Sequence, residues 1–153
     1  MTYTADESKT VMQAVMMSGM AVAIADMGII STAIEMSALA KELVGATRHY
    51  PNNSIIQSIF SEAALKHNSP GEVPKDITPE NASDKAIEAI NSAISLLSTK
   101  ATPAEVNEFK QFVYTSAEAV ANAAGSGLFG SGAQKVSDRE AATLAKLKAA
   151  LGL

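Results

Sequence analysis

Apolar residues recur at spacings of three and four along most of the chain, and this spacing restricts the fold more than any other feature. It places apolar side chains on one face of an α-helix, whereas a half-buried strand needs strict alternation. The clearest stripes cover residues 36–43, 87–97, 106–124 and 144–151. Because strand signals do not recur, the sequence predicts an all-α fold.

Start signals divide these segments into about six helices. A Ser or Thr followed three residues later by Glu forms a capping box, in which hydroxyl and carboxylate satisfy N–H groups at the helix start. The pattern is present at Thr32 with Glu35, Thr102 with Glu105, and Ser137 with Glu140. We expect helices over about 6–27 and 32–48, one after an Asn53 cap, one over 87–97, and one each from Thr102 and Ser137. The third is expected to carry Ile55, Ile56, Ile59, Phe60 and Ala63.

Length and composition favour a single soluble domain over residues 1–153. A chain of this size buries roughly 70% of its unfolded surface. Cysteine is absent, which excludes disulfides and cysteine nucleophiles and fits a reducing, cytoplasmic compartment. The formal net charge is −4 without a cluster of Lys and Arg, so no nucleic-acid partner is expected.

The stretch Thr10–Ala25 contains no charged residue and therefore raises the question of a membrane span. It has 16 residues and includes Gln13, Ser18 and Gly19. A spanning helix needs about 20 predominantly apolar residues. We therefore expect a central helix that is buried on most sides, with its methionines filling irregular core space. Peripheral membrane association is the minor alternative.

Two parts of the chain repeat each other. Residues 21–25 read Ala-Val-Ala-Ile-Ala and residues 119–123 read Ala-Val-Ala-Asn-Ala, an offset of 98 positions. The tripeptide Leu-Ala-Lys then occurs at 39–41 and 144–146, an offset of 105. The difference of seven corresponds to a glycine-rich loop at 125–132. We interpret this as a pseudo-duplicated helical hairpin, although alanine-rich helices also produce such similarity by chance.

These residues resemble the tellurite-resistance TerB-like family. Its members are all-helical and combine a small-residue helix end, an Asp-Gly-type turn and a capped second helix with an acid in its first turn. Residues 23–28 and 32–35 resemble the first such unit, and residues 121–124 and 136–140 the second. The turns depart from the pattern, because the first reads Asp-Met-Gly and the second carries a long insertion. The resemblance implies a stress or tellurite response without a firm enzymatic activity.

The resemblance also implies a divalent metal at acidic turn residues, here Asp26, Glu35 and Glu140. Hard cations take six or more oxygen ligands, several of them from carboxylates. The first turn supplies two acids, and Ser31 and Thr32 add only hydroxyl oxygens. Glu35 also has a sufficient role in its capping box. We therefore expect capping at this turn, with metal binding as the alternative and no other cofactor.

The glycine-rich loop contains Gly125-Ser126-Gly127-Leu128-Phe129-Gly130, which matches the spacing G-x-G-x-x-G. A dinucleotide site needs a strand before these glycines and a helix directly after them. A predicted helix precedes them here, so we expect a connecting loop. Leu128 and Phe129 either pack onto the bundle or form a tip that contacts a protein partner or a second copy.

His49 and His67 lie at predicted helix C-termini, where a cation interacts favourably with the helix dipole. Neither belongs to a nucleophile–base or metal-ligand pattern, and no other catalytic constellation is present. The sequence therefore favours a non-enzymatic stress-response or binding module, related to tellurite resistance, that acts through protein or membrane-surface contacts. The alternative is a metal-ion-binding protein that uses the acidic helix-turn residues.

Overall fold

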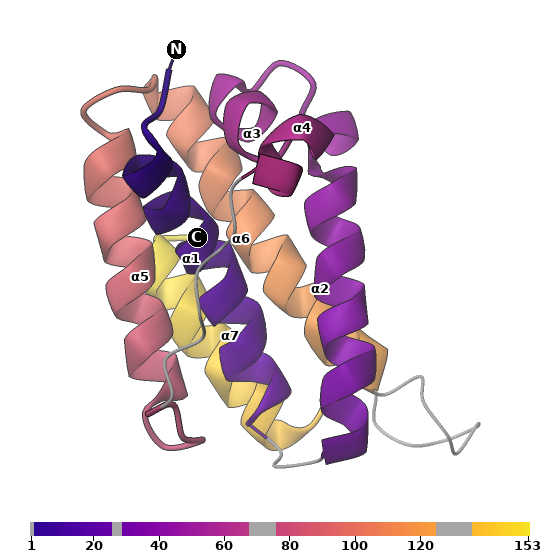
Figure 1. Ribbon diagram of the computed structural model, residues 1–153. Coiled ribbons are helices and arrows are strands. Elements are labelled where there is room, and N and C mark those ends of the chain that lie inside the picture. Colours follow the sequence, from indigo (N-terminus) through magenta and orange to yellow (C-terminus); the bar gives the residue numbers. More distant parts are fainter. Residues whose placement is uncertain (1, 26–28, 68–75, 125–135) are drawn as a thin grey trace.

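The computed structural model describes residues 2–25, 29–67, 76–124 and 136–153, with the backbone alone at 29–34 and 124. These residues form seven helices and no strand (Figure 1). The helices are α1 (Ala5–Ala23), α2 (Ile29–His49), α3 (Ser54–Ile59), α4 (Glu62–His67), α5 (Ala82–Leu97), α6 (Pro103–Ala124) and α7 (Asp138–Leu151). The predicted all-α bundle is confirmed.

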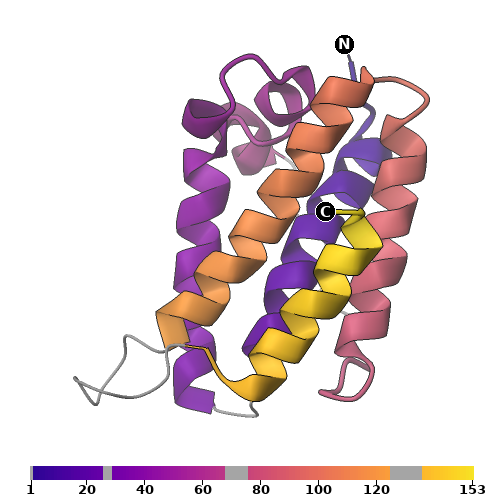
Figure 2. The ribbon, with the colours of Figure 1, turned by 180° about the vertical axis from the view of Figure 1, so that it is seen from behind.

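The helices pack around α1. This helix lies against α5 on one side and α6 on the other, and α6 packs in turn along α2. Helix α7 contacts α5, α6 and α1 and is seen best from behind (Figure 2). Helices α3 and α4 lie at one end of the bundle. At the opposite end, α1 and α6 finish and α2, α5 and α7 begin; we call this the hairpin end.

Helix α1 starts and ends earlier than the sequence predicts. Thr4 is its N-cap and forms a capping box with Glu7, in which the hydroxyl accepts from the Glu7 N–H at 3.2 Å and the carboxylate from the Thr4 N–H at 2.8 Å. The helix ends at Ala23, where the Ile24 N–H donates to the Met20 carbonyl and the Ala25 N–H donates to the Val22 carbonyl. The predicted end at residue 27 is therefore wrong.

The charge-free stretch forms the buried central helix that was predicted. Val11, Ala14, Val15 and Val22 are fully buried, and the Ser18 hydroxyl donates to the Ala14 carbonyl at 2.6 Å. Met12 and Met17 are buried, while Met16 and Met36 pack against the core from its edge. Within the described residues, no helix has the length and apolar character that a membrane span requires.

The predicted third helix is divided into two short helices, which brings the number from six to seven. Asn53 caps α3 as expected, because its side-chain oxygen accepts from the Ile56 N–H at 3.1 Å. The helix stops before Phe60, which is buried, and the Ser61 hydroxyl then accepts from the Ala64 N–H at 3.3 Å in the first turn of α4. The hydroxyl therefore stabilises a second helix start.

A polar cluster joins α3 to the start of α6. The fully buried Asn53 donates from Nδ2 to the Glu105 carbonyl and to Glu108 Oε2, each at 2.9 Å. The Ser54 hydroxyl donates to Glu105 Oε1 at 2.5 Å. This bond and those from the Thr102 hydroxyl and N–H lower the pKa of Glu105 to about 2. The predicted Thr102–Glu105 capping box is therefore present and also holds a neighbouring helix.

Candidate binding site at the hairpin end

The two glutamates named as metal candidates lie at matching positions of the two hairpins. An offset of 105 separates Glu35 from Glu140, as it separates the two Leu-Ala-Lys tripeptides. Glu35 is 1% exposed in α2 and Glu140 is 2% exposed in α7. Asp26, the third candidate, lies outside the described residues. In the part of the chain that is described, no group of three or more acids and histidines is placed to hold a metal ion.

Only one of the two hairpins keeps its predicted capping box. Ser137 caps α7: its hydroxyl accepts from the Glu140 N–H at 3.1 Å, and its N–H donates to Glu140 Oε2 at 2.8 Å. Helix α2 instead begins at Ile29, so Thr32 lies inside the helix and Glu35 is its seventh residue. The predicted Thr32–Glu35 capping box is therefore wrong. The apolar residues before Thr32 include no helix breaker, and the helix extends through them.

The remaining sequence candidates are placed as follows. His49 and His67 are the last residues of α2 and α4, as predicted. Leu128 and Phe129 lie, with the whole G-x-G-x-x-G segment, outside the described residues. Their role as packed residues or as an interaction tip therefore stays a prediction.

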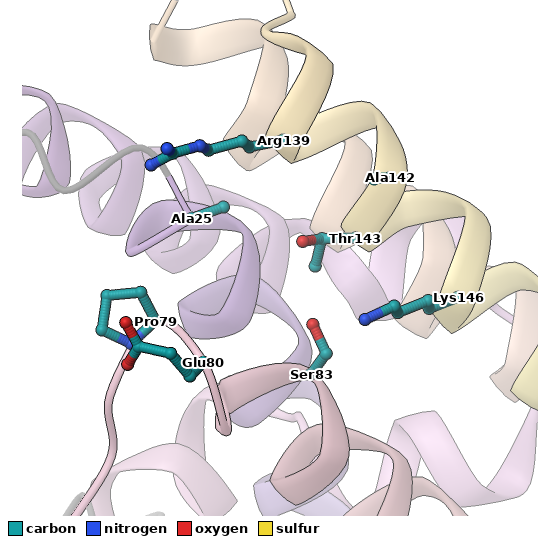
Figure 3. Close-up of a pocket in the computed structure, with 8 residues that line it drawn as sticks. All are labelled: Ala25, Pro79, Glu80, Ser83, Arg139, Ala142, Thr143 and Lys146. Atoms are coloured by element: carbon teal, nitrogen blue, oxygen red, sulfur yellow. The ribbon is translucent and has the colours of Figure 1, made fainter.

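An open pocket at the hairpin end was not predicted from the sequence (Figure 3). Its volume is about 370 Å³, within the range typical of small-molecule sites. It lies between the start of α5 and the exposed face of α7, and Ala25, two residues after the end of α1, lies at its edge. The lining residues are Ala25, Pro79, Glu80, Ser83, Arg139, Ala142, Thr143 and Lys146.

The start of α5 borders the pocket without a side-chain cap. Asn81 occupies the N-cap position but makes no hydrogen bond to the first turn. Its side chain is turned toward the preceding loop, where it accepts from the Thr78 N–H and donates to the Asp76 carbonyl, each at 2.8 Å. Among the described residues, the N–H groups of Ser83 and Asp84 therefore have no acceptor. Helix N-termini with free N–H groups attract anions.

Two hydroxyl groups face the pocket between the helices. Ser83 on α5 is 8% exposed and Thr143 on α7 is 7% exposed. In Figure 3 the Ser83 oxygen is directed toward Thr143, whereas the Thr143 methyl group faces Ser83 and the Thr143 oxygen points toward the Ala25 side of the pocket. Neither side chain forms a hydrogen bond with another described residue. Neither hydroxyl oxygen is among the fully buried side-chain atoms of the described residues that lack a partner, so both are accessible from the open pocket, where a ligand can bond them.

Charged side chains lie along the rim of the pocket. Arg139 extends over Ala25 and away from the two hydroxyls, and the Lys146 ammonium points from α7 toward the space beside Ser83 (Figure 3). Glu80 carries the opposite charge; hydrogen bonds from the Thr78 side chain and its own backbone lower its pKa, so it is ionised at neutral pH. With two cations and one anion, the pocket has a formal charge of +1 in a chain whose net charge is −4.

The pocket could not be predicted from the sequence, because its residues are far apart along the chain. The sequence does indicate one part of it: spacings of four and three place Arg139, Thr143 and Lys146 on one helix face. Comparison of the chain with protein-family models, with curated proteins and with solved structures finds no match.

Proposed function

We propose that the chain is a non-enzymatic binding module that acts in a stress response of the tellurite-resistance TerB-like kind. The observation that carries this proposal is the arrangement of the hairpin end. Both hairpins there combine a small-residue helix end with a second helix that carries a buried glutamate at the matching position, Glu35 or Glu140. The second hairpin also has the capped helix start with an acid in its first turn that the resemblance implies, whereas α2 has no acid in its first turn. The adjacent open pocket supplies a place where a ligand can bind.

The stress role is testable by growth. A tellurite-sensitive bacterial host that expresses the chain is expected to tolerate several-fold more tellurite than the same host with an empty vector. A matched control expresses Glu140→Ala, which removes the carboxylate of the second capping box and destabilises α7 by about 1 kcal/mol or more. Equal growth of wild-type and vector strains, at matched soluble expression, would count against the stress role.

Metal binding is the second candidate, and the two buried glutamates favour it. We expect Mn²⁺, Ca²⁺ or Zn²⁺ to change the melting temperature little, because two carboxylates are fewer ligands than hard cations take. A single site at 100 times its dissociation constant would add about 2.7 kcal/mol of stability. A clear rise in melting temperature that disappears in Glu35→Gln and in Glu140→Gln, but not in the exposed Glu88→Gln, would replace the leading proposal with this one.

A further inference from the structure

We propose that the pocket between α5 and α7 binds the anionic group, phosphate or carboxylate, of a small molecule. The inference deepens the binding role proposed above and rests on it, but it makes no use of the tellurite resemblance. Its evidence is the chemistry of the pocket itself: free backbone donors at the start of α5, and two hydroxyl side chains and two cations among the lining residues.

The backbone supplies the first set of donors. In a 16-residue helix such as α5, the peptide dipoles sum to about half a positive charge at the N-terminus. An N-cap side chain usually satisfies part of this end, but Asn81 is hydrogen-bonded to residues 76 and 78 instead. The N–H groups of Ser83 and Asp84 therefore remain available to oxygen atoms of a ligand.

The hydroxyls supply an independent reason to expect a ligand. Ser83 and Thr143 line the pocket from two different helices, and each residue is more than nine-tenths buried. The Ser83 oxygen is directed into the space between α5 and α7 (Figure 3), and its side chain forms no hydrogen bond with another described residue. An anionic oxygen in this space can accept from the Ser83 hydroxyl beside the open start of α5.

The charges decide which anions fit. Arg139 presents a planar fork of donors that suits phosphate and carboxylate, and Lys146 adds a compact positive charge. Glu80 stays ionised on the Pro79 side of the pocket and repels a second anionic group there. The ligand is therefore expected to carry one anionic group and a neutral or hydroxylated body, which a volume of about 370 Å³ accommodates.

Titration of the full chain with inorganic phosphate, and then with glycerol phosphate, tests the proposal by NMR. Amide signals of Ser83, Asp84 and Thr143 should shift and saturate. The double variant Arg139→Gln/Lys146→Gln should weaken binding at least tenfold. Both side chains are exposed, so the fold should be retained, which the spread of the other amide signals checks. Lys148→Gln is the matched control on α7, because its ammonium lies over the Tyr114 ring, 5.5 Å from the centroid.

Two results would overturn the proposal: no saturable shift of these amides at tens of millimolar ligand, or equal affinity of the wild type and the double variant. Phosphate binding without tellurite tolerance in the growth test would rule out the stress role and leave the pocket assignment intact. Tellurite tolerance without phosphate binding would rule out the pocket assignment alone.

Sedimentation with vesicles that contain phosphatidic acid identifies the source of the anionic group. Glycerol phosphate binding without vesicle binding supports a soluble ligand. Vesicle binding that glycerol phosphate inhibits, and that the double variant loses, supports a lipid headgroup in the same pocket. Vesicle binding that the double variant keeps, with no binding of free phosphate, would contradict the proposal.

Discussion

Replacing Phe112 by alanine is expected to lower the free energy of unfolding by about 3–5 kcal/mol. Phe112 is 1% exposed on α6. Its ring meets those of Phe60 and Tyr50 edge to face, with centroids 5.2 Å and 5.8 Å away. These contacts hold the α3 region and the end of α2 against α6, so the substitution leaves a cavity where three elements meet. Urea denaturation followed by circular dichroism measures the change.

The neighbouring residue provides the control for this prediction. Gln111 is exposed on the same helix, and Gln111→Ala should change stability by no more than about 0.5 kcal/mol. Phe112→Leu keeps most of the buried volume and should fall between the two variants. A Phe112→Ala protein within about 1 kcal/mol of wild type would show that the aromatic contacts are not part of a tightly packed core.

Replacing Asn53 by alanine is expected to cost about 2–4 kcal/mol, the second largest effect. The substitution removes the cap of α3, worth about 0.5–2 kcal/mol. It also removes the donor to the Glu105 carbonyl and to the Glu108 carboxylate, and hydrogen bonds to charged groups contribute about 1.5–3 kcal/mol. Exposed Asn52 is the matched control, and Asn52→Ala should be nearly neutral in the same denaturation experiment.

Asn53→Asp separates the cap from the contact with α6. Aspartate keeps an oxygen for the Ile56 N–H but loses the amide donor and adds a negative charge beside Glu108. We expect it to destabilise the protein about as much as alanine at neutral pH. An Asp variant as stable as wild type would show that the cap, and not the link between helices, is what Asn53 contributes.

The same cluster makes stability depend on pH through Glu105. Its pKa in the folded protein is about 2, below the ordinary value of 4.5, chiefly because of the Ser54 hydroxyl. A lowered pKa contributes stability that is present above the ordinary value and is lost as the pH falls toward 2. The Glu105→Gln variant should therefore lose less stability than wild type between pH 4.5 and pH 2.

Helix starts could be predicted from the sequence wherever a local hydrogen bond decides them. The caps at Asn53 and Ser137 depend on residues within one turn, and the structure contains both. The capping-box pattern Thr-x-x-Glu is less reliable. It is present and forms at Thr4, where the sequence analysis did not predict a cap. It was predicted at Thr32 but does not form a cap there, because the backbone is already helical from residue 29. The pattern indicates which hydrogen bonds can form within one turn. How far a helix extends depends also on its packing against the rest of the bundle.

The candidate pocket depends on contacts that no local pattern contains. Ser83 and Thr143 are 60 positions apart in the sequence and line the same pocket because α5 and α7 both pack beside α1. Asn81 also looks like an ordinary cap in the sequence, and only the loop at 76–78 turns its side chain away. The Ser137–Glu140 capping box was predicted correctly because it is local, whereas a metal at Glu140 stays a prediction.

Native mass spectrometry of the full chain with glycerol phosphate and Mn²⁺ tests most directly whether this protein is a binding module for small anions. We predict one equivalent of glycerol phosphate per chain for the wild type and for Lys148→Gln, greatly reduced occupancy in Arg139→Gln/Lys146→Gln, and no stoichiometric Mn²⁺. One tightly held Mn²⁺ that Glu35→Gln or Glu140→Gln abolishes, with no glycerol phosphate above the level of the double variant, would contradict this account.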